Sequence, residues 1–368
     1  MISRIRLLGR TAASFLAAGA LVLAASGGET NASRAERVQG SGSYVIALSN
    51  SFLGNTWRKT MVDIFQQTAQ QAKAKGLISD FRVENTSENT ATEQIAQIKS
   101  LILEHVSAIL IDSASPSALN PVIQQACGQK IVVVVFDSLA SAPCEYNLED
   151  SIQQYGFQEG HYVAVGMHGH GNVIIARGVV GSAPEAVIYG GQLQALKQFP
   201  KIKVVSTVIG QASDSITEQA ILSVLPSLPA VQGVITGGSS FGAVQAFQKA
   251  HRSLPVVAFD NSGEALQFWQ TQHAKNGYSA VSLRTEPGQA AAAFWEAMAI
   301  LQGKMVPKML VFPNLVITPS NLNQWAKVVP VGKVAAYLWT SAQTQAEIAR
   351  IEKHQSLLIP PAPTTAIP

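Results

Sequence analysis

The chain has 368 residues, 47% of them hydrophobic and 13% charged, which leaves room for two domains and excludes an intrinsically disordered protein. Its formal net charge is +3, but Arg4, Arg6 and Arg10 all lie in the first ten positions. Without these three, 23 of the 26 basic residues remain, against 23 acidic ones. The composition therefore gives no nucleic-acid footprint, which would need clustered lysine and arginine. A polytopic membrane protein is also excluded, because beyond residue 25 no hydrophobic run approaches the roughly 20 residues of a membrane-spanning helix.

The first 42 residues are expected to be a targeting segment and a linker. The three arginines precede an uncharged apolar stretch from Ala12 to Ala25, which small residues close, as in a secretory signal. We predict a signal peptide over residues 1–25, a flexible lead-in over 26–42, and a periplasmic location. An N-terminal anchor helix is the alternative that this stretch leaves open.

From residue 44 onward, apolar strands alternate with amphipathic helices. Hydrophobic side chains at helical spacing, such as Trp57, Met61 and Phe65, predict the first helix, and Gly76 ends it. The strands expected in this first block are 44–48, 81–84, 108–111 and 131–136. The last of these, IVVVVF, has no polar residue, which is typical of a parallel strand covered on both faces.

The same alternation continues in a second block of the chain. The strands expected there are 173–176, 204–209, 231–236, 255–259 and 280–283, each preceded or followed by a helix. This βα repetition predicts an α/β fold, and about nine strands predict two doubly wound parallel-sheet lobes rather than one sheet. Shorter strands follow near residues 310–317. The tail over 341–368 ends in LLIPPAPTTAIP and is predicted to be unstructured because it is rich in proline.

The only cysteines are Cys127 and Cys144. An exported chain has an oxidising compartment available, so we expect a disulfide between them. Two separate buried thiols are the alternative. A metal site is not expected, because the two cysteines have no histidine or cysteine partner at short spacing. His168 and His170 stand two residues apart, which is more typical of a solvated turn than of a metal site.

Polar side chains follow the predicted strands, where ligands bind in open parallel sheets. Carboxylates and amides there pair with neighbouring hydroxyls, and an indole packs against the C–H face of a sugar ring. This set favours a neutral polyhydroxylated ligand. An aspartate after a strand can equally cap the next helix, and a tryptophan can simply belong to the core. The candidate ligand-binding residues are Asn50, Asn55, Trp57, Ser113, Asp137, Ser182, Ser239 and Asp260.

One motif suggests an enzyme instead. Gly238–Gly242 fits G-x-S-x-G between a strand and a helix, the context of a hydrolase nucleophile. Ser240 would then be the nucleophile, with Asp260 and His273 following in hydrolase order. His273, however, lies at the end of a predicted helix, and no HGGG-like oxyanion segment precedes the motif. We therefore keep the serine esterase only as the alternative function.

The order of four segments resembles one known family. YVIALSNSFLGNTWRKTM, VSAILIDSASPSALNPVIQQA, IVVVVFD and LPVVAFDNSGEAL, within residues 43–327, are similar to the type I periplasmic binding proteins of the ribose-binding kind. These are substrate-binding subunits of sugar ABC transporters. The resemblance implies a monomer, not an enzyme, without a cofactor, that captures a sugar or polyol and delivers it to a membrane permease. A membrane sensor is the other client that such a protein could serve.

The resemblance also implies how the two lobes are assembled. Residues 43–150 with 284–308 would form one lobe, and residues 151–283 with 309–330 the other. Three crossovers would join them, near Asp150, near Leu283–Arg284 and near Lys304–Lys308. The two lobes would close on the ligand like a hinge.

This sequence departs from the family pattern at three places in the second lobe. Val187 stands where the family has an arginine, Gly237–Ser239 where an asparagine or aspartate is common, and Leu283 where a glutamine is frequent. Three polar ligands of the ribose type are therefore missing. We expect a less polar pocket, and a ligand other than ribose itself.

Overall fold

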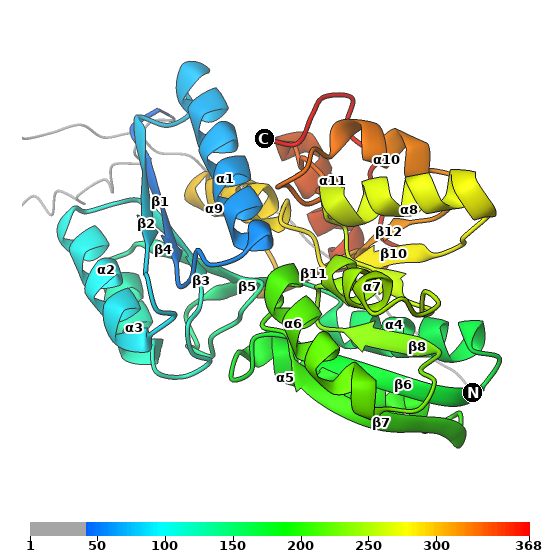
Figure 1. The fold of residues 1–368 in the computed structure, drawn as a ribbon. Coiled ribbons are helices and arrows are strands. Elements are labelled where there is room, and N and C mark those ends of the chain that lie inside the picture. The colour runs from blue at the N-terminus through cyan, green and yellow to red at the C-terminus, as the bar shows by residue number, and fades with distance from the viewer. Residues whose placement is uncertain (1–41) are drawn as a thin grey trace, which may run out of the picture. The chain divides into compact units, whose positions relative to one another are not determined.

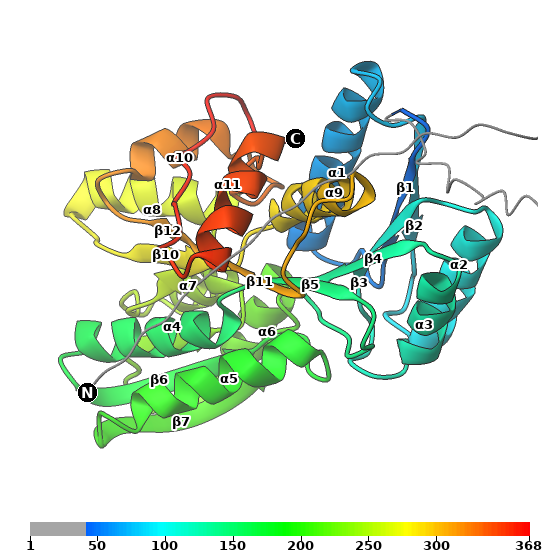
Figure 2. The ribbon, with the colours of Figure 1, turned by 180° about the vertical axis from the view of Figure 1, so that it is seen from behind.

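The computed structural model describes residues 42–368 (Figures 1 and 2). The predicted signal peptide, and the predicted lead-in up to residue 41, lie outside the described residues. None of the helices in the described part of the chain is long and apolar enough to cross a membrane.

The first lobe is built on a parallel six-stranded sheet in the order β11-β5-β4-β3-β1-β2. Four helices cover its two faces. The strands are β1 Val45–Asn50, β2 Asp80–Asn85, β3 Ala108–Asp112, β4 Val132–Phe136, β5 Tyr146–Asp150 and β11 Met309–Phe312; the helices are α1 Thr56–Ala74, α2 Ala91–Leu103, α3 Asn120–Gly128 and α9 Gln289–Leu301.

The central strands of this sheet are buried on both faces, which explains their unbroken apolar sequence. In β3, Ala108 and Leu110 belong to the core that α1 and α9 cover, whereas Ile109 and Ile111 belong to the core beneath α2 and α3. Successive side chains of a strand point to opposite faces, so a doubly covered strand needs an apolar residue at every position.

The second lobe holds two three-stranded sheets, β7-β6-β8 and β12-β10-β9. A parallel bridge between Gly233 and Val256 connects them, and β12 is antiparallel to β10. The strands are β6 His170–Arg177, β7 Lys201–Ile209, β8 Gly233–Thr236, β9 Ala258–Phe259, β10 Val281–Arg284 and β12 Leu315–Ile317; the helices are α4 Ile152–Gly166, α5 Ala183–Leu196, α6 Asp214–Val224, α7 Ser240–Lys249, α8 Gly263–Asn276 and α10 Leu322–Val328, with a short 3₁₀ helix at Leu225–Ser227.

The chain crosses between the lobes at three places, and the third of them differs from the sequence prediction. The first two passages follow Asp150 and Arg284, as expected. The third lies between Phe312 and Leu315, not at Lys304–Lys308, because β11 pairs with β5 in the first lobe. Sequence analysis missed β5 because its half-buried residues carry no unbroken apolar run, and so it left β11 without a partner.

The prediction of an unstructured tail was wrong. Residues Ser341–Glu352 form the helix α11, which begins at a capping box of Thr340 and Gln343. Beyond it, Leu358 donates its backbone N–H to Glu347, and Ile367 donates to the carbonyl of Val328. The proline-rich composition prevents secondary structure after residue 354, but the segment still packs on the rest of the chain.

Residues 329–340, here called the strap, connect α10 of the second lobe to α11 beside α9 of the first (Figure 2). On the second lobe, Ala335 donates its N–H to the carbonyl of Asn261. On the first lobe, Val334 donates its N–H to the hydroxyl of Thr60. The strap is therefore a fourth passage between the lobes, in addition to the three crossovers.

The two cysteines form a disulfide in the structure, with 6.4 Å between their Cα atoms. Cys127 lies in the last turn of α3, and Cys144 precedes β5. The bridge ties α3 to the loop between β4 and β5.

Replacing Cys144 with serine is expected to lower the free energy of unfolding. The bond spans a sequence separation of 17 residues, and cross-linking a loop of this length restricts the unfolded chain by about 3 kcal/mol. Urea unfolding of oxidised protein measures the loss. A Cys127→Ser/Cys144→Ser double variant should lose no more than the single one. Two titratable thiols in unreduced wild-type protein would contradict the pairing.

Two buried carboxyl groups meet where the first and second crossovers lie. The Glu286 backbone N–H donates to Asp150 Oδ2 at 2.6 Å. Glu286 in turn accepts from the backbone N–H groups of Gly288 and Tyr337 and from Trp339 Nε1 at 2.8 Å. Burial raises the pKa of Asp150 well above its usual range, with Glu286 beside it adding to the shift. Burial also raises the pKa of Glu286, to about 8, although its three donors act against that shift, so the proton is held most firmly on Asp150.

This pair predicts that stability falls as pH rises. The native state holds a proton on Asp150 that the unfolded chain releases near pH 4, so its contribution is complete below pH 4 and is lost through the raised native pKa. Asp150→Asn, which mimics the protonated form, should exceed wild type in stability at pH 8. The difference should shrink towards pH 4 in thermal melts across pH.

A second variant should change the pH dependence of stability in the opposite direction. Lys73 and Arg82 hold the pKa of the exposed Asp80 below its usual value, so Asp80→Asn should cost stability at neutral pH and nothing in strong acid. Asp150→Asn and Asp80→Asn should therefore change the pH profile in opposite directions. Parallel profiles would show that Asp150 is ionised in the folded protein.

Candidate ligand-binding cleft

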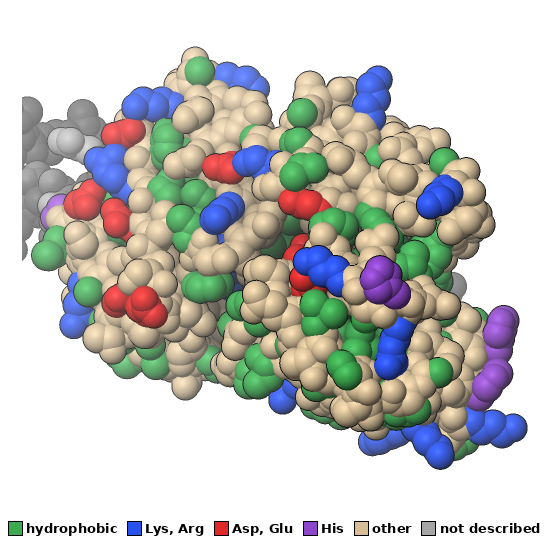
Figure 3. Space-filling view, in the orientation of Figure 1, with side chains coloured by type: hydrophobic (Ala, Val, Ile, Leu, Met, Phe, Trp, Pro, Cys, Tyr) green, Lys and Arg blue, Asp and Glu red, His purple; other side chains and the backbone are tan. Residues whose placement is uncertain are grey.

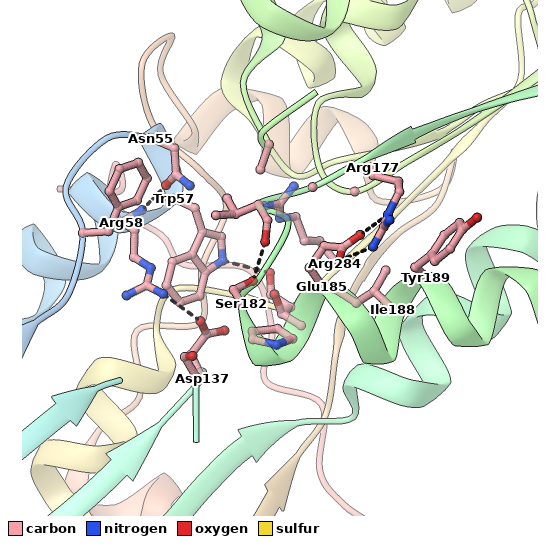
Figure 4. A pocket seen from close by; sticks show the side chains of 18 of the residues that line it. Asn55, Trp57, Arg58, Asp137, Arg177, Ser182, Glu185, Ile188, Tyr189 and Arg284 are labelled. Carbon is pink, nitrogen blue, oxygen red and sulfur yellow. Dashed lines mark hydrogen bonds and ion pairs between the residues drawn. The ribbon is translucent and has the colours of Figure 1, made fainter. Parts of the chain in front are cut away.

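A cavity lies between the two lobes, at the carboxyl ends of their strands (Figure 4). Asp137 follows β4 directly, Arg177 ends β6 and Arg284 ends β10. Parallel strands bring these ends to one edge of each sheet, which is where ligands bind in open α/β folds. The cavity is lined by Phe52, Asn55, Trp57, Arg58, Asn89, Ser113, Asp137, Ser138, Arg177, Gly178, Val179, Ser182, Pro184, Glu185, Ile188, Tyr189, Gln192, Ala212, Gly237, Arg284 and Thr285.

The start of α1 positions three side chains of the first-lobe wall. Asn55 is the N-cap, and its Oδ1 accepts from the Arg58 backbone N–H at 2.8 Å. The cap fixes the first turn of the helix, so Trp57 and Arg58 enter the cavity from a rigid element. Trp57 is 5% exposed and donates Nε1–H to the carbonyl of Thr285 at 3.3 Å. The indole therefore connects the cavity wall to the second crossover.

The Arg58 guanidinium lies between two carboxylates. It pairs with Asp112, and its Nη2 lies 3.6 Å from Asp137 Oδ2. Burial raises the pKa of both acids, although Arg58 acts against the shift at each and Arg284 acts against it at Asp137. Asp137 has a φ of 56°, a left-handed conformation in which aspartate and asparagine are tolerated. Its Oδ1 accepts from Gln289 at 3.3 Å.

The second-lobe wall holds an ion pair of its own. Arg177 bonds Glu185 through Nε and Nη2 at 2.7 and 2.8 Å, and its guanidinium lies 4.3 Å from the centre of the Tyr189 ring. Ser182 donates its hydroxyl to the carbonyl of Val179 at 2.9 Å. These polar groups satisfy one another before any ligand enters.

The structure brings five of the eight predicted ligand-binding residues to this cavity: Asn55, Trp57, Ser113, Asp137 and Ser182. Asn50 and Ser239 do not line it. Asn50 is fully buried and bonds Asn85 and the carbonyl of Phe52, so it is a structural residue of β1. Ser239 lies within hydrogen-bond distance of Thr217 and is 1% exposed.

Asp260 lies at a second, more polar cavity, which shares Asn55, Trp57 and Arg284 with the first. Its Oδ2 accepts from the backbone N–H and the hydroxyl of Ser240, at 2.9 and 3.0 Å, and its Oδ1 accepts from Ser262 at 3.0 Å. These bonds join the starts of α7 and α8. Asp260 thus joins two helices inside its own lobe and also lines a cavity, and its ligand-binding role stays a prediction.

The geometry does not support the esterase alternative. Ser240 is completely buried and donates its hydroxyl directly to Asp260. His273 is exposed in the last turn of α8, where its Nδ1 lies 3.1 Å from the carbonyl of Tyr278. A nucleophile without its histidine and without access to solvent cannot perform acyl transfer. His168 and His170 form a local turn, and residues 42–368 contain no cluster of metal-ligating side chains.

Apart from Asp137, sequence analysis did not name the charged residues of the cavity, nor the buried Asp112 that pairs with Arg58, as ligand-binding candidates. Arg58 follows Trp57 directly, and Asp112, Arg177 and Arg284 each end a strand. A charged residue at the last position of a buried strand is the signal that could have found three of them. Glu185 could not have been found in this way, because its ion pair with Arg177 depends on how α5 packs beside β6.

The model of the periplasmic binding protein domain family matches residues 46–305. The chain belongs to this family. The match covers most of both lobes, and the family consists of ligand-binding components rather than enzymes, as the sequence resemblance indicated.

Several members and solved structures are similar to the chain. A xylitol-binding protein of Mycolicibacterium smegmatis is 25% identical over 245 residues, 65% of this chain and 69% of that protein. An ABC transporter solute-binding protein of Thermobispora bispora is 42% identical, covers 88% of this chain and all of its own, and superposes with a TM-score of 0.83. A solute-binding protein of Bacillus halodurans with bound myo-inositol is 19% identical with a TM-score of 0.68, over 78% of this chain and 99% of that one, which supports the fold alone.

Proposed function

We propose that this protein binds a sugar or polyol in the cavity between its lobes and delivers it to an ABC transporter permease. The observation that carries the proposal is the first-lobe wall, where the Trp57 indole stands beside the Asp137 carboxylate and the Asn55 amide. Carboxylates and amides pair with neighbouring hydroxyls, and the indole face packs on C–H groups. The xylitol-binding relative supports this class of ligand, and the ABC transporter solute-binding protein of Thermobispora bispora supports delivery to a permease.

The expected mechanism breaks no bond. The lobes are connected by crossovers after Asp150, Arg284 and Phe312, and a ligand that contacts both walls favours the conformation in which they approach each other. The loaded form is presented to the permease and opens to release the ligand. We place this cycle outside the cytoplasm, in a monomer whose leader would be removed on export.

A ligand screen tests the proposal. Xylitol, myo-inositol and common aldoses and ketoses are titrated into the purified chain by isothermal calorimetry, alongside mass spectrometry of any molecule that co-purifies. At least one polyhydroxylated compound should bind in the micromolar range or tighter, and Trp57→Ala should abolish that binding without loss of fold. If none of them binds while an amino acid or an oligopeptide does, the proposed ligand class is wrong.

A further inference from the structure

The two walls of the cleft offer a ligand different chemistry. On the first lobe, polar groups remain free for a ligand: the side chains of Asn89 and Ser138 make no hydrogen bond with any described residue, and Asn55 uses only its oxygen. Asp137 Oδ2 has one ion-pair contact, at 3.6 Å from Arg58. This wall can therefore both donate hydrogen bonds to the hydroxyl groups of a ligand and accept hydrogen bonds from them.

On the second lobe, the Arg284 side chain at the end of β10 makes no hydrogen bond with any described residue and stays available to a ligand, whereas Arg177, Glu185, Ser182 and Gln192 are already engaged. Arg177 and Glu185 bond each other twice, and Ser182 donates to the carbonyl of Val179. Gln192 donates to Glu159 at 2.8 Å and to the carbonyl of Thr236 at 3.1 Å. A ligand hydroxyl facing these four engaged residues would have to compete with bonds that hold the lobe together.

Away from Arg284, the α5 side of the second-lobe wall offers mainly apolar groups. Pro184 and Ile188 are four residues apart on α5, so they share one face of the helix, and Val179 lies in the loop before it. Val187, beside Ile188, is 45% exposed, and Val180, beside Val179, is 43% exposed. Figure 3 shows hydrophobic side chains scattered over the surface of the second lobe as well as the first. Two exposed valines therefore adjoin, in the chain, apolar residues that line the cavity.

We propose that the ligand is amphipathic: a glycoside whose hydroxylated ring lies against the first lobe and whose alkyl or aryl aglycone lies against Val179, Pro184 and Ile188. The aglycone extends from these residues towards the exposed Val180 and Val187. This inference rests on the proposed function and narrows its ligand class. The departures of Val187 and Gly237 from the polar residues of ribose-type proteins are consistent with this division of the two walls.

Burial of the aglycone would make the protein prefer a glycoside to its parent sugar. A tenfold gain in affinity corresponds to about 1.4 kcal/mol, which needs only about 55 Å² of apolar surface removed from water. A phenyl group exceeds that area when one face and an edge are covered. The phenyl β-D-glycosides of xylose, glucose and galactose are therefore suitable probes, each compared with its parent sugar.

The inference is tested by calorimetric titration of the purified protein with each parent sugar and with its phenyl glycoside. For the sugar that binds, the phenyl glycoside should bind at least tenfold more tightly than the parent. Ile188→Asn should reduce this ratio to nearly one. Val204→Asn is the matched control, because Val204 on β7 is 44% exposed and lines neither cavity, and its ratio should equal that of wild type.

Each other outcome overturns a specific statement. If a parent sugar binds and its phenyl glycoside binds no more tightly, the amphipathic ligand is wrong and the proposed function stands. If Ile188→Asn weakens sugar and glycoside by the same factor, the second-lobe wall does not hold the aglycone. If no sugar, polyol or glycoside binds, the proposed function fails, and this inference fails with it.

Discussion

Replacing Asp137 with asparagine is expected to weaken ligand binding by about tenfold to over a hundredfold. Hydrogen bonds to a charged group contribute about 1.5–3 kcal/mol each, and 1.4 kcal/mol is a factor of ten in affinity. Asparagine keeps the shape of the side chain and tolerates the φ of 56° at this position. The change therefore removes an acceptor without disturbing the backbone after β4.

The same substitution should not lower the stability of the fold. Burial raises the pKa of Asp137, so the folded protein gains nothing from its charge, and Arg58 keeps Asp112 as a partner. Affinity is measured by calorimetry with whichever sugar or polyol the screen identifies, and stability by thermal melts. We expect a large loss in the first measurement and none in the second.

Asp260→Asn is the matched control, since both aspartates follow a strand. Three donors face Asp260 from Ser240 and Ser262, so its replacement should lower the melting temperature while changing affinity far less than Asp137→Asn. If the two variants lose affinity equally, Asp260 reaches the ligand, as its position after a strand predicts. Wild-type affinity in Asp137→Asn would remove Asp137 from the site.

The sequence predicted the first-lobe wall better than the second for a physical reason. Trp57 and Asp137 are placed by local signals, a helix cap at Asn55 and the end of an unbroken apolar strand. Asp260 has the same local signal at the end of β9. What distinguishes it is the side chain of Ser240, which reaches it from a neighbouring element. Pairing of this kind depends on tertiary packing, which periodicity along the chain does not encode.

The apolar strands were enough to predict the fold class, but the sequence pattern did not predict the strands at the edges of the sheets. β5 and β11 lie at one edge of the first sheet, where β5 is only half buried and carries polar residues at alternate positions. Their pattern resembles a loop as much as a strand. The third crossover was misplaced for this reason, and the tail was misread because composition alone does not show that Ile348 and Ile367 are buried.

Replacing Trp339 with alanine is expected to lower the free energy of unfolding by about 3–5 kcal/mol, the usual cost of removing a buried aromatic ring. Trp339 is 3% exposed, and its ring lies 4.7 Å from that of Phe312 and 5.8 Å from that of Tyr337. Its Nε1 donates to the buried Glu286 at 2.8 Å. The substitution therefore leaves a cavity and deprives a buried carboxylate of one donor.

Two further variants separate these contributions. Trp339→Phe keeps a ring but removes the N–H, so it should cost about 1–3 kcal/mol, the penalty for an unsatisfied buried group. Val331→Ala changes a strap residue that is 61% exposed and should stay within about 0.5 kcal/mol of wild type. Urea unfolding of the three variants should therefore rank them in the order Trp339→Ala, Trp339→Phe, Val331→Ala.

The ranking decides whether the strap is part of the folded unit or an appendage. Because the strap bonds Thr60 of the first lobe and Asn261 of the second, a loss at Trp339 should shift the unfolding of both lobes in one transition. If Trp339→Ala unfolds with the midpoint of wild type, the strap detaches before the lobes unfold and contributes nothing to their association. A loss confined to one of two separate transitions would show that the strap stabilises a single lobe.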